Sequence, residues 1–292
     1  MENENIKEII EQSGHELENE AVLILEKNNW SCISSSYYVD NITGKSREVD
    51  IIAKKEFSIF DIENIENISK KKKILIKLFI SCKFIKDDIV FWFGKKNIIK
   101  ANELVKNGLS LNQEELERNE SVLKFHHYNI EKNVANKNAQ KGNKDIIFNA
   151  REESIKSFLY SPLEDDEFEY KEIYKFPIVI VNNFDNFCKR DDSSKDRCLK
   201  IENNFQFEIL YSILISGHPK RKYFLVDFIS IDRLEFFLKE NFEKVEKKEN
   251  WEIKENDISL IKKILSEKIR KERFYENRND FIEKEEFDPY DQ

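Results

Sequence analysis

Residues 46–55, SREVDIIAKK, place a cluster of charged side chains directly before a run of apolar ones. Arg47, Glu48 and Asp50 are followed at once by Ile51 and its apolar neighbours, and β-branched residues of this kind are typical of a buried strand. A carboxylate at the edge of such a strand is costly to bury unless it is paired or holds a metal. The sequence therefore predicts a partner for Asp50 elsewhere in the chain.

The residues before this stretch predict a helix followed by a β-hairpin. Residues 14–29 have the period of an amphipathic helix, and Ser13 is placed to cap its N-terminus. Residues 30–39 form a β-rich run that ends in Asn, Asp and Gly, which are typical turn residues. We therefore expect this run to pair with the strand that begins at 46. The predicted core positions of the helix are Leu17, Ala21, Ile24, Leu25 and Asn28.

A second apolar strand follows the hairpin. Residues 62–73 lack a strand pattern and predict a loop or a short helix, whereas residues 74–85, ILIKLFISCKFI, are an almost continuous apolar run that contains Lys83. Lys83 could extend along the sheet to solvent, or it could pair with a carboxylate. We expect residues 87–93, DDIVFWF, to pair with this strand.

The rest of the chain continues the mixture of strands and helices, which indicates a mixed α/β fold. We expect one extended domain rather than two, because no linker rich in Pro, Gly or Ser separates the halves. The predicted segments are a helix at 97–109, a polar insertion at 112–143, an amphipathic helix at 144–160 facing the sheet through Ile147, Ala150, Ile155 and Phe158, a buried strand at 176–184, a polar loop at 188–200, strands at 205–215 and 222–230, and helices at 232–242 and 257–285.

The composition bounds the class of protein. The 292 residues are 40% hydrophobic and include 23 Phe, which is enough for a packed core. We expect a soluble cytoplasmic protein with no membrane partner, because no apolar run approaches the roughly 18 residues of a membrane span and the first ten residues are acidic. The net charge of −8 argues against non-specific coating of nucleic acid, although basic clusters such as residues 218–222 leave room for local contacts.

Three of the predicted elements bring charge to one edge of the sheet: an acid on the first helix, Asp50, and Lys83. Carboxylates can hold a divalent metal that orients water for attack on a phosphodiester, and a lysine can stabilise the developing negative charge or help to activate the water. Mg²⁺ in particular prefers oxygen ligands. The pattern therefore indicates phosphodiester chemistry.

The order of these motifs resembles the PD-(D/E)xK nuclease superfamily, whose fold is called restriction-endonuclease-like. A helix with G-x-x-x-E, a strand with V-D-hydrophobic and an apolar strand ending in x-x-K occur in that order, as in Holliday-junction resolvases and Mrr-like restriction enzymes. The resemblance implies that Gly14 and Glu18 correspond to the helix motif, that Asp50 is the metal-binding aspartate and that Lys83 is the catalytic lysine. It also implies Mg²⁺ or Mn²⁺ as the cofactor, held by Asp50, Glu18 and the backbone carbonyl of Cys82.

The same resemblance implies an architecture. Residues 1–185 would form the restriction-endonuclease-like core, with helices on both faces of a mixed sheet and an insertion at about 110–143. Residues 186–292 would add a β-hairpin and a helical extension packed on the same sheet.

Ser81 departs from the family pattern, because it stands where the family normally has Glu. Serine is neutral and shorter, so a metal loses both a charge and a ligand. In some restriction enzymes of this fold the strand reads S-x-K and a following element supplies the acid. Asp87, Asp88 and Glu103 are the candidates for that role in this sequence.

Three functional hypotheses follow. The first is a Mg²⁺-dependent deoxyribonuclease that binds DNA, works in phage defence or DNA repair and forms a homodimer. The second is a catalytically degenerate member that serves as a nucleic-acid or protein binding module. The third is an unrelated α/β interaction protein, which predicts that Glu18, Asp50 and Lys83 lie far apart.

Simpler interpretations of the same residues stay open. Asp50 could merely end a strand in a salt bridge to Lys83, and Glu18 could be an ordinary surface acid. Glu18 lies on the apolar side of its helix, however, whereas Glu16 and Glu20 point elsewhere. Glu48 is most simply explained by pairing with a neighbouring basic residue. Cys82 is expected to pack inward and not to act as a nucleophile.

Overall fold

The computed structural model describes residues 14–40, 42–60, 71–97, 99–101, 133–141, 145–161, 170, 172–191, 198–215 and 218–249. The chain divides into two compact units, residues 1–57 with 73–246 and residues 58–72 with 247–292. Nearly all described residues belong to the first unit; those of the second are 58–60, 71–72 and 247–249. The predicted helix at 257–285 lies outside the described residues, as do Ser13 and Glu103.

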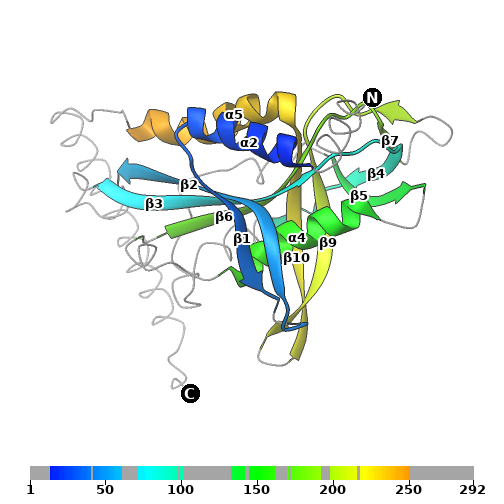
Figure 1. Ribbon diagram of the computed structural model, residues 1–292, viewed down its shortest axis with the longest axis horizontal. Helices are drawn as coiled ribbons and strands as arrows, with labels where there is room; N and C mark the ends of the chain where they lie inside the picture. Colours follow the sequence, from blue (N-terminus) through cyan, green and yellow to red (C-terminus); the bar gives the residue numbers. More distant parts are fainter. Residues whose placement is uncertain are drawn as a thin grey trace, which may run out of the picture. The chain divides into compact units, whose positions relative to one another are not determined.

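The fold is mixed α/β, with one large mixed sheet (Figure 1). The strand order is β1-β2-β3-β6-β10-β9-β5-β4-β7-β8. The strands are β1 (Ser31–Val39), β2 (Ser46–Phe60), β3 (Lys71–Lys83), β4 (Ile89–Lys95), β5 (Asn133–Gln140), β6 (Glu172–Val181), β7 (Phe187–Asp191), β8 (Leu199–Lys200), β9 (Phe205–Ile215) and β10 (His218–Ser230). The described helices include α2 (His15–Lys27), α4 (Ile146–Tyr160), the short 3-10 helix η4 (Ile231–Arg233) and α5 (Leu234–Glu249).

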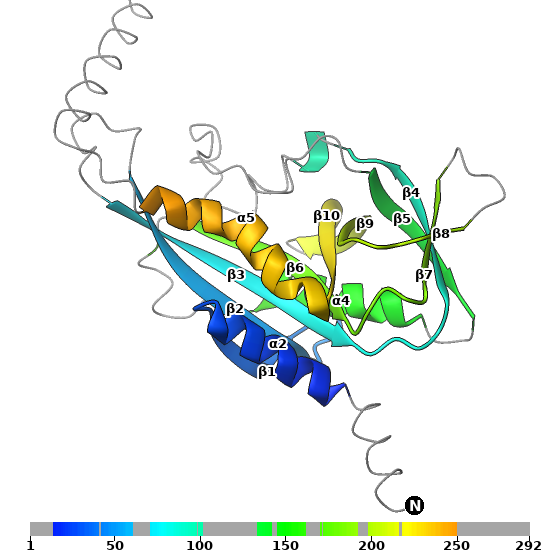
Figure 2. The ribbon, with the colours of Figure 1, turned by 90° about the horizontal axis from the view of Figure 1, so that it is seen from above.

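The part of the sheet that carries the predicted motifs is built from β1, β2, β3 and β6. β1 and β2 form the predicted antiparallel hairpin, and β2 is followed in the sheet by β3. β3 and β6 are parallel, with α4 between them in the chain. Figures 1 and 2 show α2 and α5 on one face of this sheet and α4 on the other. Among the described helices, none combines the length and apolar composition needed to span a membrane.

The predicted pairing of residues 87–93 with the second apolar strand is wrong. β4 pairs with β5 and β7 instead, at the other end of the sheet. The reason is that β3 has β2 on one side and β6 on the other, so that neither of its edges is free for β4.

Two segments predicted to be loops contain strands. The polar insertion includes β5, and the loop at 188–200 includes most of β7 and all of β8. These strands are short or polar: only Val134 and Ala135 of β5 are buried. Their extended form depends on backbone pairing with neighbouring strands, which leaves little hydrophobic pattern in the sequence.

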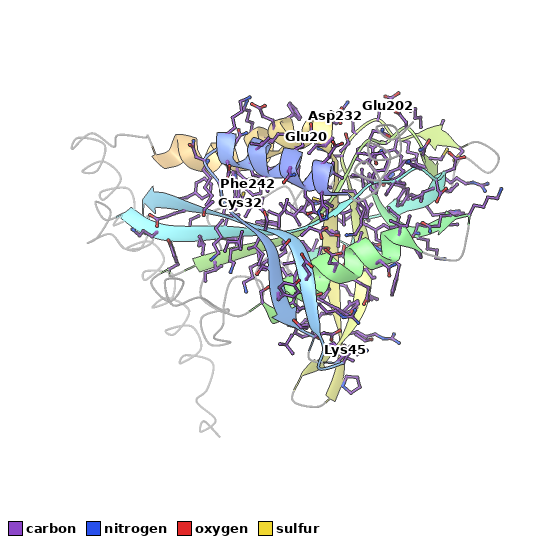
Figure 3. All side chains as sticks on the ribbon, viewed as in Figure 1. Glu20, Cys32, Lys45, Glu202, Asp232 and Phe242 are labelled. Carbon is purple, nitrogen blue, oxygen red and sulfur yellow. The ribbon has the colours of Figure 1, made fainter. Side chains whose placement is uncertain are left out.

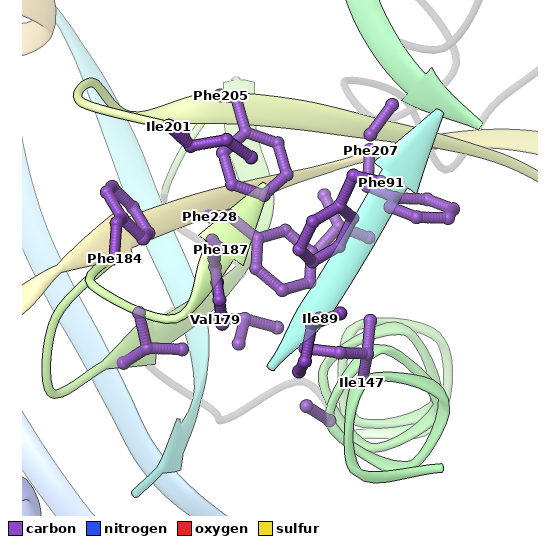
Figure 4. Packing of buried hydrophobic residues seen from close by; sticks show 14 of the residues in the cluster. Ile89, Phe91, Ile147, Val179, Phe184, Phe187, Ile201, Phe205, Phe207 and Phe228 are labelled. Carbon is purple, nitrogen blue, oxygen red and sulfur yellow. The ribbon is translucent and has the colours of Figure 1, made fainter. Parts of the chain in front are cut away.

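A core rich in Phe lies between α4 and the sheet (Figure 4). Phe205 of β9 and Phe228 of β10 stack at 5.0 Å between ring centroids, and the Phe91 ring lies 5.0 Å from Phe205. α4 closes this core with Ile147, Ala150 and Ile155, as its period predicts. Burying a Phe side chain contributes roughly 2–3 kcal/mol, so this core holds α4 firmly on the sheet.

The first helix packs on the opposite face, with Leu17, Ala21 and Leu25 buried as predicted. The residue before it is Gly14, whose φ of 80° favours glycine, and among the described residues no side chain caps the helix. The ammonium of Lys27 lies 3.3 Å from a carboxylate oxygen of Glu235, which joins α2 to α5.

A buried aspartate closes the turn of the β1–β2 hairpin. Asp40 is 0% exposed, and its Oδ1 accepts hydrogen bonds from the backbone N–H of Ile42 (2.9 Å) and of Thr43 (3.4 Å). Its Oδ2 lies 3.1 Å from the ammonium of Lys156 on α4. These contacts fix the turn of the hairpin against α4.

We expect Asp40→Ala to lower the free energy of unfolding by about 3 kcal/mol, because it removes the buried charge partner of Lys156 and the acceptor of two backbone N–H groups. Asp40→Asn is the control, since its amide oxygen can still accept from Ile42. Urea unfolding at pH 7 measures both. A loss below 1 kcal/mol, taken as roughly the contribution of one ordinary hydrogen bond, would contradict this role for Asp40.

The stabilisation should also depend on pH. Burial alone would raise the pKa of Asp40, but the Ile42 N–H and the Lys156 ammonium outweigh it, so the pKa lies below its ordinary value of 3.8. A lowered carboxyl pKa stabilises the fold above the unfolded-state pKa, and this contribution is lost as the pH falls through the folded-state pKa. The difference between wild type and Asp40→Ala should therefore shrink below about pH 4.

Candidate functional site

The β1–β2 hairpin changes its packing face at Asp50. In a regular strand, residues 32 and 38 would point to the same side. Cys32 instead lies near Glu26 of α2, whereas Tyr38 packs with Phe158 of α4. Figure 3 shows Cys32 near the α2 face and Lys45 at the far end of the bent hairpin.

A left-handed residue accompanies the change of face. Ser35 has a φ of 53°, and the register of Ser34 with Ile51 and of Ser36 with Val49 puts it opposite Asp50. A non-glycine residue in this region costs about 1 kcal/mol or more, so the surrounding structure must hold it there. As a result, Asp50 lies opposite the point in β1 where the side chains change the face of the sheet to which they point.

The predicted partner of Asp50 is Lys83. Asp50 Oδ2 accepts a hydrogen bond from the backbone N–H of Cys82 at 2.6 Å and another from the ammonium of Lys83 at 3.0 Å. Both donors are on β3, next to β2 in the sheet. This compensates the half-buried carboxylate that the sequence places at the edge of the apolar run.

Glu153 of α4 completes the group and was not among the predicted site residues. Its Oε2 lies 2.9 Å from the Lys83 ammonium, so that Lys83 bridges two carboxylates. Burial, together with the charge of Asp50, raises the pKa of Glu153 to about 7 against the lowering effect of Lys83. Burial would lower the pKa of Lys83, but Glu153 and Asp50 outweigh it and raise that pKa. Lys83 is therefore held in its charged form.

Glu18 also belongs to this neighbourhood. Burial raises its pKa, as does the charge of Asp50, while His15 and Lys83 act in the opposite direction. His15 Nδ1 lies 3.4 Å from Glu18 Oε2. Glu18, Asp50 and Lys83 therefore lie within electrostatic range of one another, whereas the third hypothesis predicts that they lie far apart.

Two of the three acids considered as replacements for the missing glutamate, Asp87 and Asp88, do not lie at this position. Asp87 and Asp88 are exposed between β3 and β4, and in the described chain no hydrogen bond or ion pair joins either to Asp50. Glu103 lies outside the described residues. The backbone carbonyl of Cys82 stays a predicted ligand. Burial raises the pKa of the Cys82 thiol well above its ordinary value, consistent with an inward-packed side chain.

The helix period could have identified Glu153. It follows Ala150 by three positions and precedes Ser157 by four, and both of these residues are buried. Residues at these spacings lie on the same side of a helix. The period of α4 therefore places Glu153 at the border of the face that packs on the sheet. The acids predicted to replace the missing glutamate all lie closer to Lys83 in the chain than Glu153 does.

The available donors suit a hard cation. Glu153 Oε1 is buried and, in the described part of the chain, has no hydrogen-bond partner, so this oxygen is available to a cation. Asp50, Glu153 and Glu18 together offer carboxylate oxygens, which Mg²⁺ and Mn²⁺ prefer. In the described ranges, however, no three acidic, His or Cys side chains lie as close together as a preformed metal centre requires. Metal binding at this position would require the carboxylates to close in.

Comparison with known proteins identifies no relative. The chain matches no protein-family model, no curated protein and no solved structure.

The raised pKa of Glu153 predicts a pH-dependent effect of Glu153→Gln. Between pH 4.5 and about 7 the folded protein holds a proton that the unfolded chain has lost, so wild-type stability falls as the pH rises. Glutamine removes this cost, and Glu153→Gln should gain up to about 3 kcal/mol over wild type between pH 5 and pH 8.

Metal-free urea unfolding at a series of pH values measures this gain. Glu20→Gln, at an exposed position of α2, is the matched control and should show a flat difference. A difference for Glu153→Gln that does not change with pH would contradict the burial of its carboxylate.

Proposed function

We propose that this protein is a metal-dependent phosphodiester hydrolase that cuts DNA, a member of the PD-(D/E)xK superfamily in which Glu153 replaces the acid missing at Ser81. The observation that carries the proposal is the bridge of Lys83 between Asp50 and Glu153. It combines the predicted aspartate and lysine with a new carboxylate from the next helix.

The arrangement of the elements supports a restriction-endonuclease-like core. The first helix, the antiparallel hairpin, β3, α4 and the parallel strand β6 follow one another as that fold requires, with β4 and β5 inserted between β3 and α4. Glu18, Asp50 and Lys83 come from the helix and the two strands expected to carry them. A homodimer and a role in defence or repair stay predictions.

Each residue has a specific task in this proposal. Asp50 and Glu153 would hold Mg²⁺ or Mn²⁺, with Glu18 beside them. The bound ion would supply positive charge at the phosphate oxygen and orient the attacking water. Because Lys83 is held charged, its ammonium suits stabilisation of the negative charge that develops on the phosphate rather than removal of a proton from water.

A second function is favoured by one observation. The described residues contain no ready-made group of three ligands, and Lys83 forms ion pairs with the two central acids. A chain that has lost catalysis could keep such an ion pair for stability alone and serve as a nucleic-acid or protein binding module.

Cleavage of supercoiled and linear DNA with Mg²⁺ or Mn²⁺ tests the proposal. Asp50→Asn, Lys83→Met and Glu153→Gln should each reduce the rate about 100-fold or more, because each removes a charge that acts on the metal or the phosphate. Asp87→Asn is the control and should cut like wild type.

The alternative predicts a different result. Wild type that binds DNA in EDTA, measured by fluorescence anisotropy, but cuts with neither metal would contradict the nuclease and support the binding module. Wild type that neither cuts nor binds DNA would contradict nucleic acid as the partner in both.

A rescue experiment tests the replacement of Ser81 by Glu153. Ser81 is 0% exposed, its hydroxyl has no partner in the described chain, and it lies two positions from Lys83 on β3. Residues two apart in a strand share a face, so an acid at 81 would lie beside Lys83. Ser81→Asp should therefore restore at least about tenfold of the cleavage lost in Glu153→Gln.

Ser81→Ala in the same Glu153→Gln background is the matched control and should restore nothing. Thermal unfolding of each double variant shows that it is folded. Equal rates for the Asp and Ala double variants would contradict the equivalence of the two positions.

A further inference from the structure

Two lysines make the same kind of bridge between the hairpin and α4. Lys83 joins Asp50 of β2 to Glu153, with distances of 3.0 and 2.9 Å. Lys156 joins Asp40, at the turn of the same hairpin, to Glu152, with distances of 3.1 and 2.8 Å. Neighbouring glutamates of one helix are thus each tied to an aspartate of one hairpin.

The second bridge is rigid. Asp40 is fully buried and the Lys156 side chain is only 16% exposed. Glu152 also hydrogen-bonds Tyr211 of β9, so that this residue is held from two sides. The packing of Phe158 on Phe79 and Phe224 adds contacts one turn beyond Glu153. Together, the ion pairs of Lys156 and the ring contacts of Phe158 restrict rotation and sliding of α4 on the sheet.

Glu153 needs such support. Its carboxylate is largely buried, and the carboxylate of Asp50 is close enough to affect it. The only ion pair that Glu153 makes in the described chain is with Lys83, which it shares with Asp50. Because that one lysine is shared, Glu153 needs a further contact on its own helix to fix its position, and Lys156 is one turn away.

We propose that Lys156 is a positioning residue: its bridge between Asp40 and Glu152 holds α4 so that the Glu153 carboxylate faces Asp50 and Lys83. This inference rests on the proposed function, because the position of Glu153 matters for a metal held with Asp50. Lys156 touches neither the substrate nor the metal and acts only through the helix.

Mn²⁺ binding to the full chain, followed by electron paramagnetic resonance, tests the inference without relying on activity. Lys156→Met should weaken Mn²⁺ binding about 10- to 100-fold, as expected when support for a ligand is removed. Glu153→Gln should weaken binding at least as much. The double variant should bind no more weakly than Glu153→Gln alone, because Glu153→Gln has already removed the carboxylate that Lys156 positions.

Two further variants act as controls. Lys239→Met removes a lysine that pairs with Glu235 four positions earlier on α5, the same spacing as Lys156 and Glu152, and should bind Mn²⁺ like wild type. Lys156→Arg keeps a cation for both carboxylates and should recover much of the affinity. If Lys156→Met does not fold, Glu152→Gln, which removes only the helix side of the bridge, replaces it with a smaller expected loss.

The outcomes separate this inference from the proposed function. Wild type that binds Mn²⁺ and cuts DNA, while Lys156→Met or its replacement Glu152→Gln binds Mn²⁺ equally well, overturns the inference alone. Losses that add in the double variant also overturn it, because they show that Lys156 acts independently of Glu153. Wild type that neither binds Mn²⁺ nor cuts DNA overturns the proposed function and this inference with it.

Discussion

The carboxylate of Asp50 is the constraint on which the site depends. It lies opposite the point in β1 where the side chains change the face of the sheet to which they point. It accepts hydrogen bonds from the Cys82 N–H at 2.6 Å and from the Lys83 ammonium at 3.0 Å. A half-buried carboxylate without these donors would be strongly unfavourable. The pairing therefore holds β2 next to the end of β3. It also keeps the Lys83 ammonium beside Asp50 and Glu153.

Lys83 then makes the burial of Glu153 possible. Because one lysine faces two carboxylates, Glu153 can be buried near Asp50 at a tolerable cost, and its pKa is still raised to about 7. A divalent metal could take the place of the Lys83 ammonium between these two carboxylates, since the metal brings more positive charge to the same oxygens. The same ion pairs would also stabilise a protein with no catalytic role. Under the proposed function, the distinction between a nuclease and a binding module depends on whether the carboxylates can close around a metal.

Some of this arrangement could be predicted from the sequence and some could not. The period of residues 14–29 placed Glu18 beside the core, and the apolar runs around Asp50 and Lys83 predicted two strands that could meet. β4 was assigned to the wrong neighbour because an apolar strand carries no record of which strand it pairs with. β5 and β8 were missed because short polar strands lack a hydrophobic alternation.

The sequence by itself determined the mixed α/β class and brought Glu18, Asp50 and Lys83 under consideration, because local periodicity and the cost of burying charge act over a few residues. Only the tertiary structure decided that Glu153, far along the chain and beyond β4 and β5, meets Lys83. That contact depends on the parallel pairing of β3 with β6, which places α4 across the hairpin. The ion pair between Lys156 of α4 and Asp40 of the hairpin turn likewise joins residues that are far apart in the chain, so it leaves no local pattern in the sequence.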